Sequence, residues 1–150
     1  MPQSLSQVYL HIVFSTKYRT PLILPEIRAD LYKYIGGVVQ ELGGIPLAIS
    51  GVYDHIHILV SFPRDMTIAD FIKRIKINSS IWIKSRGNFY KHFYWQSGYG
   101  VFSVSSYKRK IVENYIRNQE EHHKNQNFQR EFVRFLNAYR IEYDERYLWD

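Results

Sequence analysis

The stretch IPLAISGVYDHIHILVSF, residues 45–62, gives the clearest indication of the fold. It contains two apolar runs with the composition of strands, 45–51 and 53–62, with no room for a helix between them. Such runs predict two antiparallel strands joined by a tight connection. The rest of the chain must supply the strands and helices that cover this hairpin.

The second strand of this hairpin carries a histidine pair. Side chains alternate between the faces of a strand, so its residues divide into two sets: Val52, Ile56, Ile58 and Val60 on one face, and Tyr53, His55, His57 and Leu59 on the other. The two histidine Cα atoms would lie about 6 to 7 Å apart, close enough for both imidazoles to bind one metal ion. Solvated or hydrogen-bonded histidines on a polar strand face are the alternative, and a metal site needs a partner elsewhere.

Hydrophobic periodicity predicts the remaining elements. A helix over 25–42 ends at two glycines, and Thr67 can act as the N-cap of a second helix with Asp70 three residues later. The order β-α-β-β-α-β-α predicts an α+β, ferredoxin-like (RRM-like) antiparallel sheet with helices on one face plus C-terminal helices. The further predicted elements are strands 7–15 and 101–105 and helices 106–124 and 127–139.

Length and composition favour one domain over residues 1–150 that acts in the cytoplasm and contacts no membrane. The chain has no cysteine, so a metal would need nitrogen or oxygen ligands. There is no signal-peptide pattern, and no apolar run is as long as a membrane span. A net charge of +6 and 17% aromatic residues favour polyanions, nucleic acids in particular.

The segment ENYIRNQEEHH, residues 113–123, offers a nucleophile and a third ligand. Tyr115 and Gln119 are four residues apart, so in a helix they share a face, which His122 or His123 continues. The alternative places Tyr115 in an amphipathic core beside Ile111 and Ile116 and leaves Gln119 at the surface.

Together these segments resemble the single-tyrosine HUH transposases of small bacterial insertion sequences, the IS200-like transposase family. The resemblance is carried by GVYD followed by His55-Ile56-His57, by WQSGYGVFSVS at 95–105, and by the helix from Tyr115 to Gln119. It implies that Tyr115 is the nucleophile, that His55, His57 and Gln119 bind Mg²⁺ or Mn²⁺, and that the C-terminal helices carry the nucleophile.

The same resemblance implies the substrate and the assembly. The implied substrate is single-stranded DNA with hairpins at the ends of the element, which is expected to be cleaved and rejoined through a 5′-phosphotyrosine intermediate. The protein is expected to be a homodimer, in which the tyrosine helix of one subunit can complete the histidine site of the other.

Two groups of cations are candidates for DNA binding. Lys73, Lys76 and Lys84 fall on one stripe of the second helix, and Lys108, Arg109 and Lys110 open the tyrosine helix. A solvated helix face is the alternative for each lysine. Nearby aromatic residues can stack on bases, but packing is favoured for most of them: Phe89, Tyr90, Phe93, Tyr94 and Trp95.

A non-catalytic RRM-like nucleic-acid-binding module is the main rival, because it has the same strand order. GYGVFSV, residues 98–104, loosely matches its aromatic signature, but Val101 stands where an aromatic belongs, and the segment lies on the fourth predicted strand rather than the third. A replication-initiating or mobilising nuclease shares the histidine triplet. The short chain and the late tyrosine argue against that reading.

Overall fold

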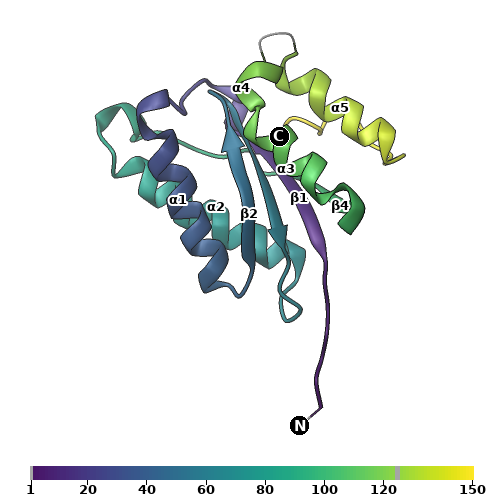
Figure 1. The fold of residues 1–150 in the computed structure, drawn as a ribbon. Coiled ribbons are helices and arrows are strands. Elements are labelled where there is room, and N and C mark those ends of the chain that lie inside the picture. The colour runs from purple at the N-terminus through teal and green to yellow at the C-terminus, as the bar shows by residue number, and fades with distance from the viewer. Residues whose placement is uncertain (1, 124–125) are drawn as a thin grey trace.

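A computed structural model describes residues 2–123 and 126–150. Four strands form one antiparallel sheet in the order β2-β3-β1-β4 (Figure 1). This confirms the predicted ferredoxin-like α+β fold. The strands are β1 (Tyr9–Ser15), β2 (Ile45–Gly51), β3 (His55–Ser61) and β4 (Gly100–Val104), and the helices are α1 (Pro25–Glu41), α2 (Ile68–Lys84), α3 (Arg109–Arg117), α4 (Gln119–His122) and α5 (Phe128–Ala138).

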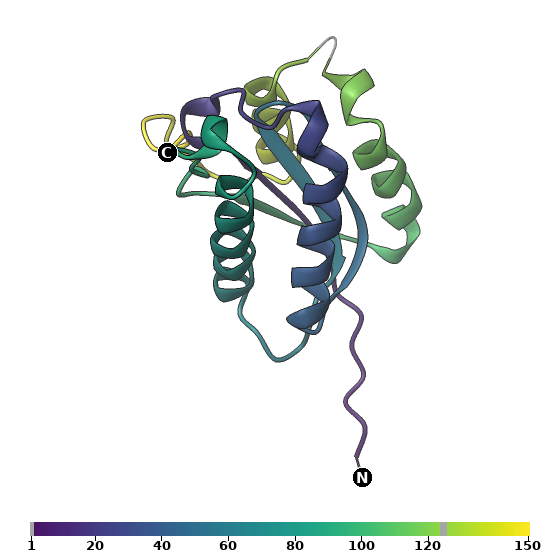
Figure 2. The ribbon, with the colours of Figure 1, turned by 90° about the vertical axis from the view of Figure 1, so that its left-hand side faces the viewer.

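Helices α1 and α2 lie side by side on one face of the sheet (Figure 2). The main apolar core lies between them and the sheet, where Ile12 on β1 pairs with Ile58 on β3 and both are fully buried. Thr67 caps α2 as predicted, since its side chain accepts a hydrogen bond from the Asp70 amide. The described residues contain no helix that is both long and apolar enough to cross a membrane.

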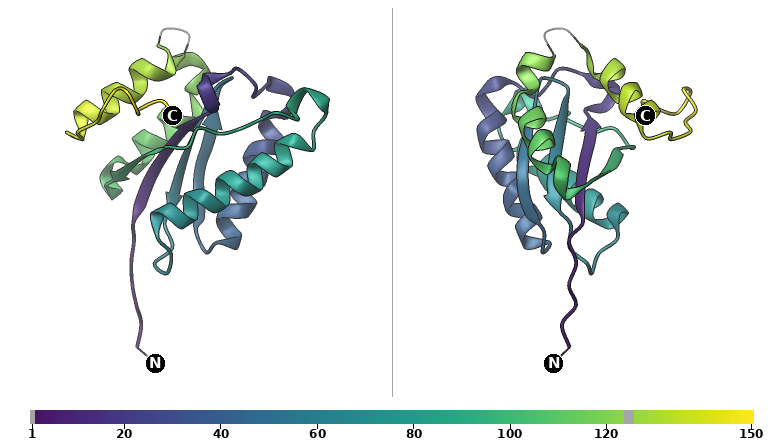
Figure 3. Two further views of the ribbon diagram at one scale, coloured as in Figure 1. Left: turned by 180° about the vertical axis from the view of Figure 1, so that it is seen from behind. Right: turned by 45° about the vertical axis from the view of Figure 1, so that its right-hand side comes forward.

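The opposite face of the sheet carries α3 and α5 (Figure 3). An apolar cluster that includes Leu59 and Ile116 joins α3 to the β2 and β3 side. A second cluster that includes Phe102 and Phe132 joins α5 to the β1 and β4 side. The histidines of β3 face this layer, as the predicted alternation requires, and polar side chains fill the space between the two clusters.

The predicted helix over 106–124 is wrong as one continuous element. A short 3-10 turn (Ser106–Lys108) precedes α3, and α3 ends before Asn118, whose φ of −100° and ψ of 25° interrupt the helix. Gln119 therefore begins α4 and does not lie on the tyrosine's own helix. Lys124, the predicted end, lies outside the described residues.

Candidate metal centre and nucleophile

The two β3 histidines are fully buried, and each has one imidazole nitrogen held by a neighbour. His55 Nδ1 donates to Asp54 Oδ1 at 2.7 Å. His57 Nδ1 lies 2.7 Å from Nε2 of buried His11 on β1. These contacts orient both rings and leave both Nε2 atoms facing the same space, as in metal sites whose ligands are oriented by outer hydrogen bonds.

His123 and Glu131 bring two more donors to this space. The ligand atoms of His55, His57, His123 and Glu131 all lie within 4.8 Å of one another. His55 Nε2 is 3.1 Å from His123 Nε2, and His57 Nε2 is 2.9 Å from Glu131 Oε1. Ligands about 2.1 Å from a common ion lie about 3.0 Å apart at a right angle and about 3.4 Å apart at the tetrahedral angle. These two spacings are those of ligands that share one metal ion.

Glu131 is absent from the candidates that the sequence suggested, although α5 carries a signal for it. Phe128, Phe132 and Phe135 form the apolar stripe of this helix, and Glu131 lies within that stripe with none of its surface exposed. A carboxylate in such a position needs buried partners. His11 was also missed. On β1, Leu10 and Ile12 point into the main core, and His11 points to the other face of the sheet, where His55 and His57 lie.

Tyr115 reaches the same centre from α3. Its hydroxyl donates a hydrogen bond to Glu131 Oε2, and Arg134 Nη2 donates to the tyrosine oxygen at 3.3 Å. The ring lies edge-on to His57, with the centroids 5.9 Å apart. The structure thus brings the predicted nucleophile beside both predicted histidines within one chain.

Burial and charge set the protonation of the centre. Burial lowers the pKa of His57 to about 4, which keeps the imidazole neutral and able to bind a metal. Burial alone would raise the pKa of Glu131, but hydrogen bonds from His123, His55 and His57 outweigh it and hold that pKa far below the usual range. Burial and the Glu131 carboxylate raise the pKa of Tyr115, so its hydroxyl keeps its proton at neutral pH.

Gln119 is fully buried next to the tyrosine. Its amide nitrogen donates to the Tyr115 carbonyl oxygen at 3.4 Å. Its own carbonyl oxygen is buried without a hydrogen-bond partner among the described residues. An orphaned oxygen of this kind is available to a ligand.

A protein-family comparison covers this centre in part. The family model described as "Transposase IS200 like" matches residues 4–119, which include Tyr115 and both β3 histidines. The chain belongs to the IS200-like transposase family. It is a transposase and a DNA-processing enzyme, and not the passive RRM-like module that the same strand order allows.

Individual relatives agree with this assignment. The transposase is 30% identical to the transposase for insertion sequence element IS200 of Salmonella typhimurium over 76% of this chain and 78% of that protein. It is 22% identical to the ISDra2 transposase TnpA of Deinococcus radiodurans, over 77% and 86% of the two chains. A solved structure, a REP-associated tyrosine transposase bound to a REP hairpin, shares the fold with a TM-score of 0.61 at 14% identity, over 82% and 72% of the chains. His123 and Glu131 follow the end of the family match.

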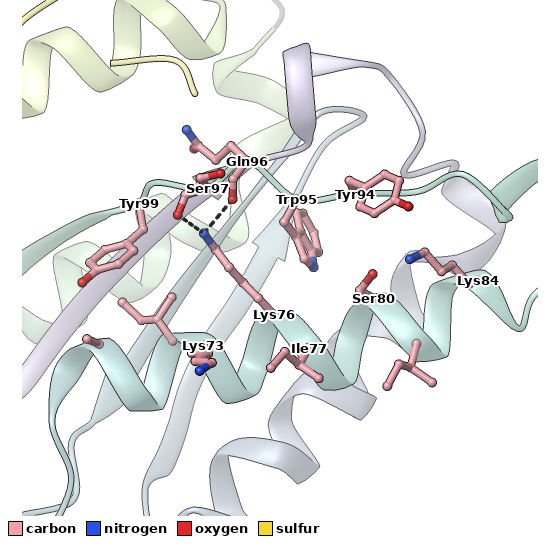
Figure 4. A pocket seen from close by; sticks show the side chains of 13 residues that line it. Lys73, Lys76, Ile77, Ser80, Lys84, Tyr94, Trp95, Gln96, Ser97 and Tyr99 are labelled. Carbon is pink, nitrogen blue, oxygen red and sulfur yellow. Dashed lines mark hydrogen bonds between the residues drawn. The ribbon is translucent and has the colours of Figure 1, made fainter. Parts of the chain in front are cut away.

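The transposase also has a groove between α2 and residues 94–99 (Figure 4). Lys73 and Lys84 line it, and the Lys84 ammonium lies 4.3 Å from the ring centroid of Tyr94, which is 56% exposed. Lys76 is held differently, because its ammonium donates to the carbonyl oxygens of Gln96, Ser97 and Gly98 at 2.6 to 3.2 Å. Of the nearby aromatic residues, Tyr90, Phe93 and Trp95 are buried, as predicted, and Phe89 and Tyr94 are exposed.

Three cations at the start of α3 differ in their contacts: Lys108 precedes the helix, and Arg109 and Lys110 begin it. Arg109 Nε donates to Glu113 at 2.8 Å, and the Lys110 ammonium lies 3.8 Å from the same carboxylate. Lys108 is exposed. Arg109 is therefore tied to its own helix, while the ammonium groups of Lys108 and Lys110 extend into solvent.

Proposed function

We propose that this transposase belongs to the HUH superfamily and cleaves and rejoins single-stranded DNA through a covalent 5′-phosphotyrosine at Tyr115. The observation that carries the proposal is the hydrogen bond from the Tyr115 hydroxyl to a carboxylate that also contacts three histidines. A nucleophile and a candidate metal site therefore share one residue, Glu131.

The reaction forms one bond to phosphorus and breaks another. The Tyr115 oxygen attacks the phosphorus, the 3′ oxygen of the preceding nucleotide leaves, and the 5′ phosphate stays on the tyrosine. The leaving 3′ oxygen becomes a hydroxyl, so overall the tyrosine proton is transferred to it. The Glu131 carboxylate accepts a hydrogen bond from the Tyr115 hydroxyl and orients it, but its lowered pKa makes it a weak base that does not retain the proton. Rejoining is the reverse: a DNA 3′ hydroxyl attacks the phosphotyrosine, and the tyrosine oxygen recovers a proton. The bond energy is kept, so ATP is not consumed.

The donor set suits a divalent cation held by His55, His57, His123 and Glu131, with the orphaned Gln119 oxygen as a further candidate. When bound, such an ion polarises a phosphoryl oxygen and offsets the negative charge that develops there. Of the two ions expected from the sequence, Mn²⁺ fits three imidazoles better than Mg²⁺, which prefers oxygen ligands.

The α2 groove and the start of α3 are proposed to hold the DNA. The groove places lysines beside exposed aromatic rings, and none of the described residues that line it is acidic. Such a lining suits a single strand that stacks its bases on the rings and pairs its phosphates with the ammonium groups. Lys73, Lys84, Lys108 and Lys110 are the candidates for direct phosphate contact, whereas Lys76 and Arg109 position the local backbone or helix. Lys76 does so through its three carbonyl contacts.

The expected substrate is the hairpin-bearing end of the insertion sequence that encodes the protein, processed by a homodimer in the cytoplasm of a bacterial or archaeal cell. Support for a hairpin comes from the REP-associated transposase, whose solved structure contains one.

Substitution of the nucleophile tests the proposal. The wild-type protein, mixed with Mn²⁺ and labelled single-stranded DNA from the end of the element, should leave a protein–DNA adduct that survives denaturing electrophoresis. Tyr115→Phe should lose the adduct and at least about a thousandfold of the cleavage rate, while DNA affinity changes little. Tyr107→Phe, an exposed tyrosine before α3, is the control and should keep both activities. Cleavage by Tyr115→Phe at the wild-type rate would refute the assignment.

A further inference from the structure

Arg28 is a buried cation, and one of its hydrogen-bond donors has no acceptor among the described residues. It lies in the first turns of α1 and is only 7% exposed. Its Nε donates to the Ile23 carbonyl oxygen at 3.0 Å, and its Nη1 donates to Glu120 at 3.1 Å. Its Nη2 is buried and has no hydrogen-bond partner among the described residues. A guanidinium removed from water normally has its donors satisfied, so the idle nitrogen points to a missing acceptor.

The pocket that Arg28 lines adjoins the candidate metal centre. Two of the residues that line it, His123 and Asp54, belong to that centre. His123 is one of the four candidate donors, and Asp54 orients His55. The other side of the pocket is formed by Arg28 and by Tyr53, whose ring lies 4.4 Å from the guanidinium and is half exposed. The pocket's volume of about 570 Å³ is in the range of sites for small molecules, so one nucleotide fits.

The partner that now holds Arg28 is easily displaced. The Glu120 side chain is 73% exposed, while that of Arg28 is 9% exposed. An exposed carboxylate gains little from such a pair, because water solvates it almost as well. A phosphate can replace it and accept hydrogen bonds from both terminal nitrogens of the fork. The remaining carboxylate of the pocket, Asp54, is already paired with His55.

We propose that this pocket binds the nucleotide next to the cleaved bond, with Arg28 donating to its phosphate in place of Glu120 and with Tyr53 supplying a ring for the base or sugar. The inference rests on the proposed single-stranded DNA substrate and names a subsite for it. Arg28 would be a positioning residue for the strand that approaches Tyr115.

Binding measurements on a Tyr115→Phe background test the subsite without cleavage. The probe is fluorescently labelled single-stranded DNA from the end of the element, followed by anisotropy. Arg28→Lys keeps the positive charge but loses the two terminal guanidinium nitrogens that can bind one phosphate together. The affinity for the DNA should fall at least about tenfold. Arg86→Lys, an exposed arginine after α2, is the matched control and should bind as the parent does. Equal affinities for the Arg28 and Arg86 variants would overturn the proposal.

A second variant leaves Arg28 and its contact with Ile23 in place, in case Arg28→Lys destabilises α1. Glu120→Gln removes the competing carboxylate and should tighten DNA binding. Glu121→Gln removes an equal charge one residue away and should tighten it less. If both glutamine variants bind alike, Glu120 does not compete with the DNA and the subsite is wrong.

In the cleaving protein, Arg28→Lys should raise KM and leave kcat nearly unchanged, because the contact is made before and during the reaction. A wild-type protein that forms no adduct would instead refute the proposed function. An active wild type with unaltered Arg28→Lys kinetics would refute the subsite alone.

Discussion

At His57, one imidazole ring faces two different partners. Nδ1 faces His11, whose pKa burial and the neighbouring His57 hold well below its usual value, and Nε2 faces Glu131. Without a metal, the proton of the neutral His57 ring lies on Nε2 and is donated to Glu131. With a metal bound, the other tautomer is needed: Nδ1 would donate to the neutral His11 and the Nε2 lone pair would be left for the metal. The histidine pair could be found from the sequence because both members lie on one strand. His123 was predicted only as one of two histidines that continue the tyrosine's face, and His11 and Glu131 were missed although each lies on a telling face of its element, because only contacts between distant segments bring them to the histidine pair.

The charge of Glu131 should matter for metal binding. Glu131→Gln keeps the shape of the side chain but removes the negative charge that faces three imidazoles, so we expect Mn²⁺ affinity to fall at least about tenfold. Titration calorimetry of the metal-free protein measures this. Glu142→Gln, at an exposed position after α5, is the control. Equal Mn²⁺ affinity in the Glu131 variant and the wild type would remove Glu131 from the ligand set.

The buried imidazoles should make the stability of the metal-free protein depend on pH. Burial lowers the pKa of His57 from 6.5 to about 4, so the folded state binds fewer protons than the unfolded chain between these values. This stabilisation is present above pH 6.5 and is lost as the pH falls towards 4. His55 acts in the opposite direction. Burial would lower its pKa, but hydrogen bonds and charge from Asp54 and Glu131 outweigh burial and raise it. The stabilisation of the folded state by protonated His55 is therefore lost as the pH rises through the raised pKa.

We therefore expect His57→Asn to flatten the loss of stability between pH 6.5 and 4, measured by urea unfolding at a series of pH values. His92→Asn, at an exposed position, should unfold with the wild-type pH dependence. A His57 variant with an unchanged slope would show that this imidazole is not buried as described.

At the scale of elements, periodicity predicted the strands and α1, α2 and α5 because each has one apolar face. The same reasoning failed at Asn118, where the sequence has neither glycine nor proline to signal a break. The break follows from contacts, since Gln119 is fully buried beside Tyr115 and α4 lies against β2. Tertiary contacts here override the local preference for a continuous helix.

Helix α5 should be able to unfold locally while the rest of the protein stays folded. Phe132 anchors it against Phe102, and a Cβ on Gly100 would lie only 2.7 Å from the Phe132 ring. Phe132→Ala should cost about 3 kcal/mol of stability and should speed hydrogen exchange in 128–138 more than in α1. It should also weaken Mn²⁺ binding, because α5 carries Glu131.

Arg130→Ala, at an exposed position of α5, is the control and should leave the exchange of this helix unchanged. Uniform acceleration over the whole protein in Phe132→Ala would contradict an independent α5.

At the scale of the whole molecule, the candidate site joins β3, α3, α4 and α5 within one chain. The family resemblance allows the tyrosine helix of one subunit to complete the site of another, whereas here Tyr115 contacts Glu131 of its own chain. A mixture of His57→Ala and Tyr115→Phe proteins distinguishes the two arrangements. We expect no recovery of cleavage, because neither chain has a complete site. Recovery towards a quarter to a half of wild-type activity would show assembly between subunits.

The most direct test of the central claim is to find the atom that carries the DNA. Wild-type protein is incubated with Mn²⁺ and single-stranded DNA from the end of the element, digested with protease and nuclease, and the peptides are analysed by mass spectrometry. If Tyr115 is the nucleophile, a nucleotide 5′ phosphate is found on the peptide that contains Tyr115, with fragment ions that assign it to that tyrosine. DNA that is cut without such a peptide, or a phosphate on another tyrosine, would show that Tyr115 is not the nucleophile.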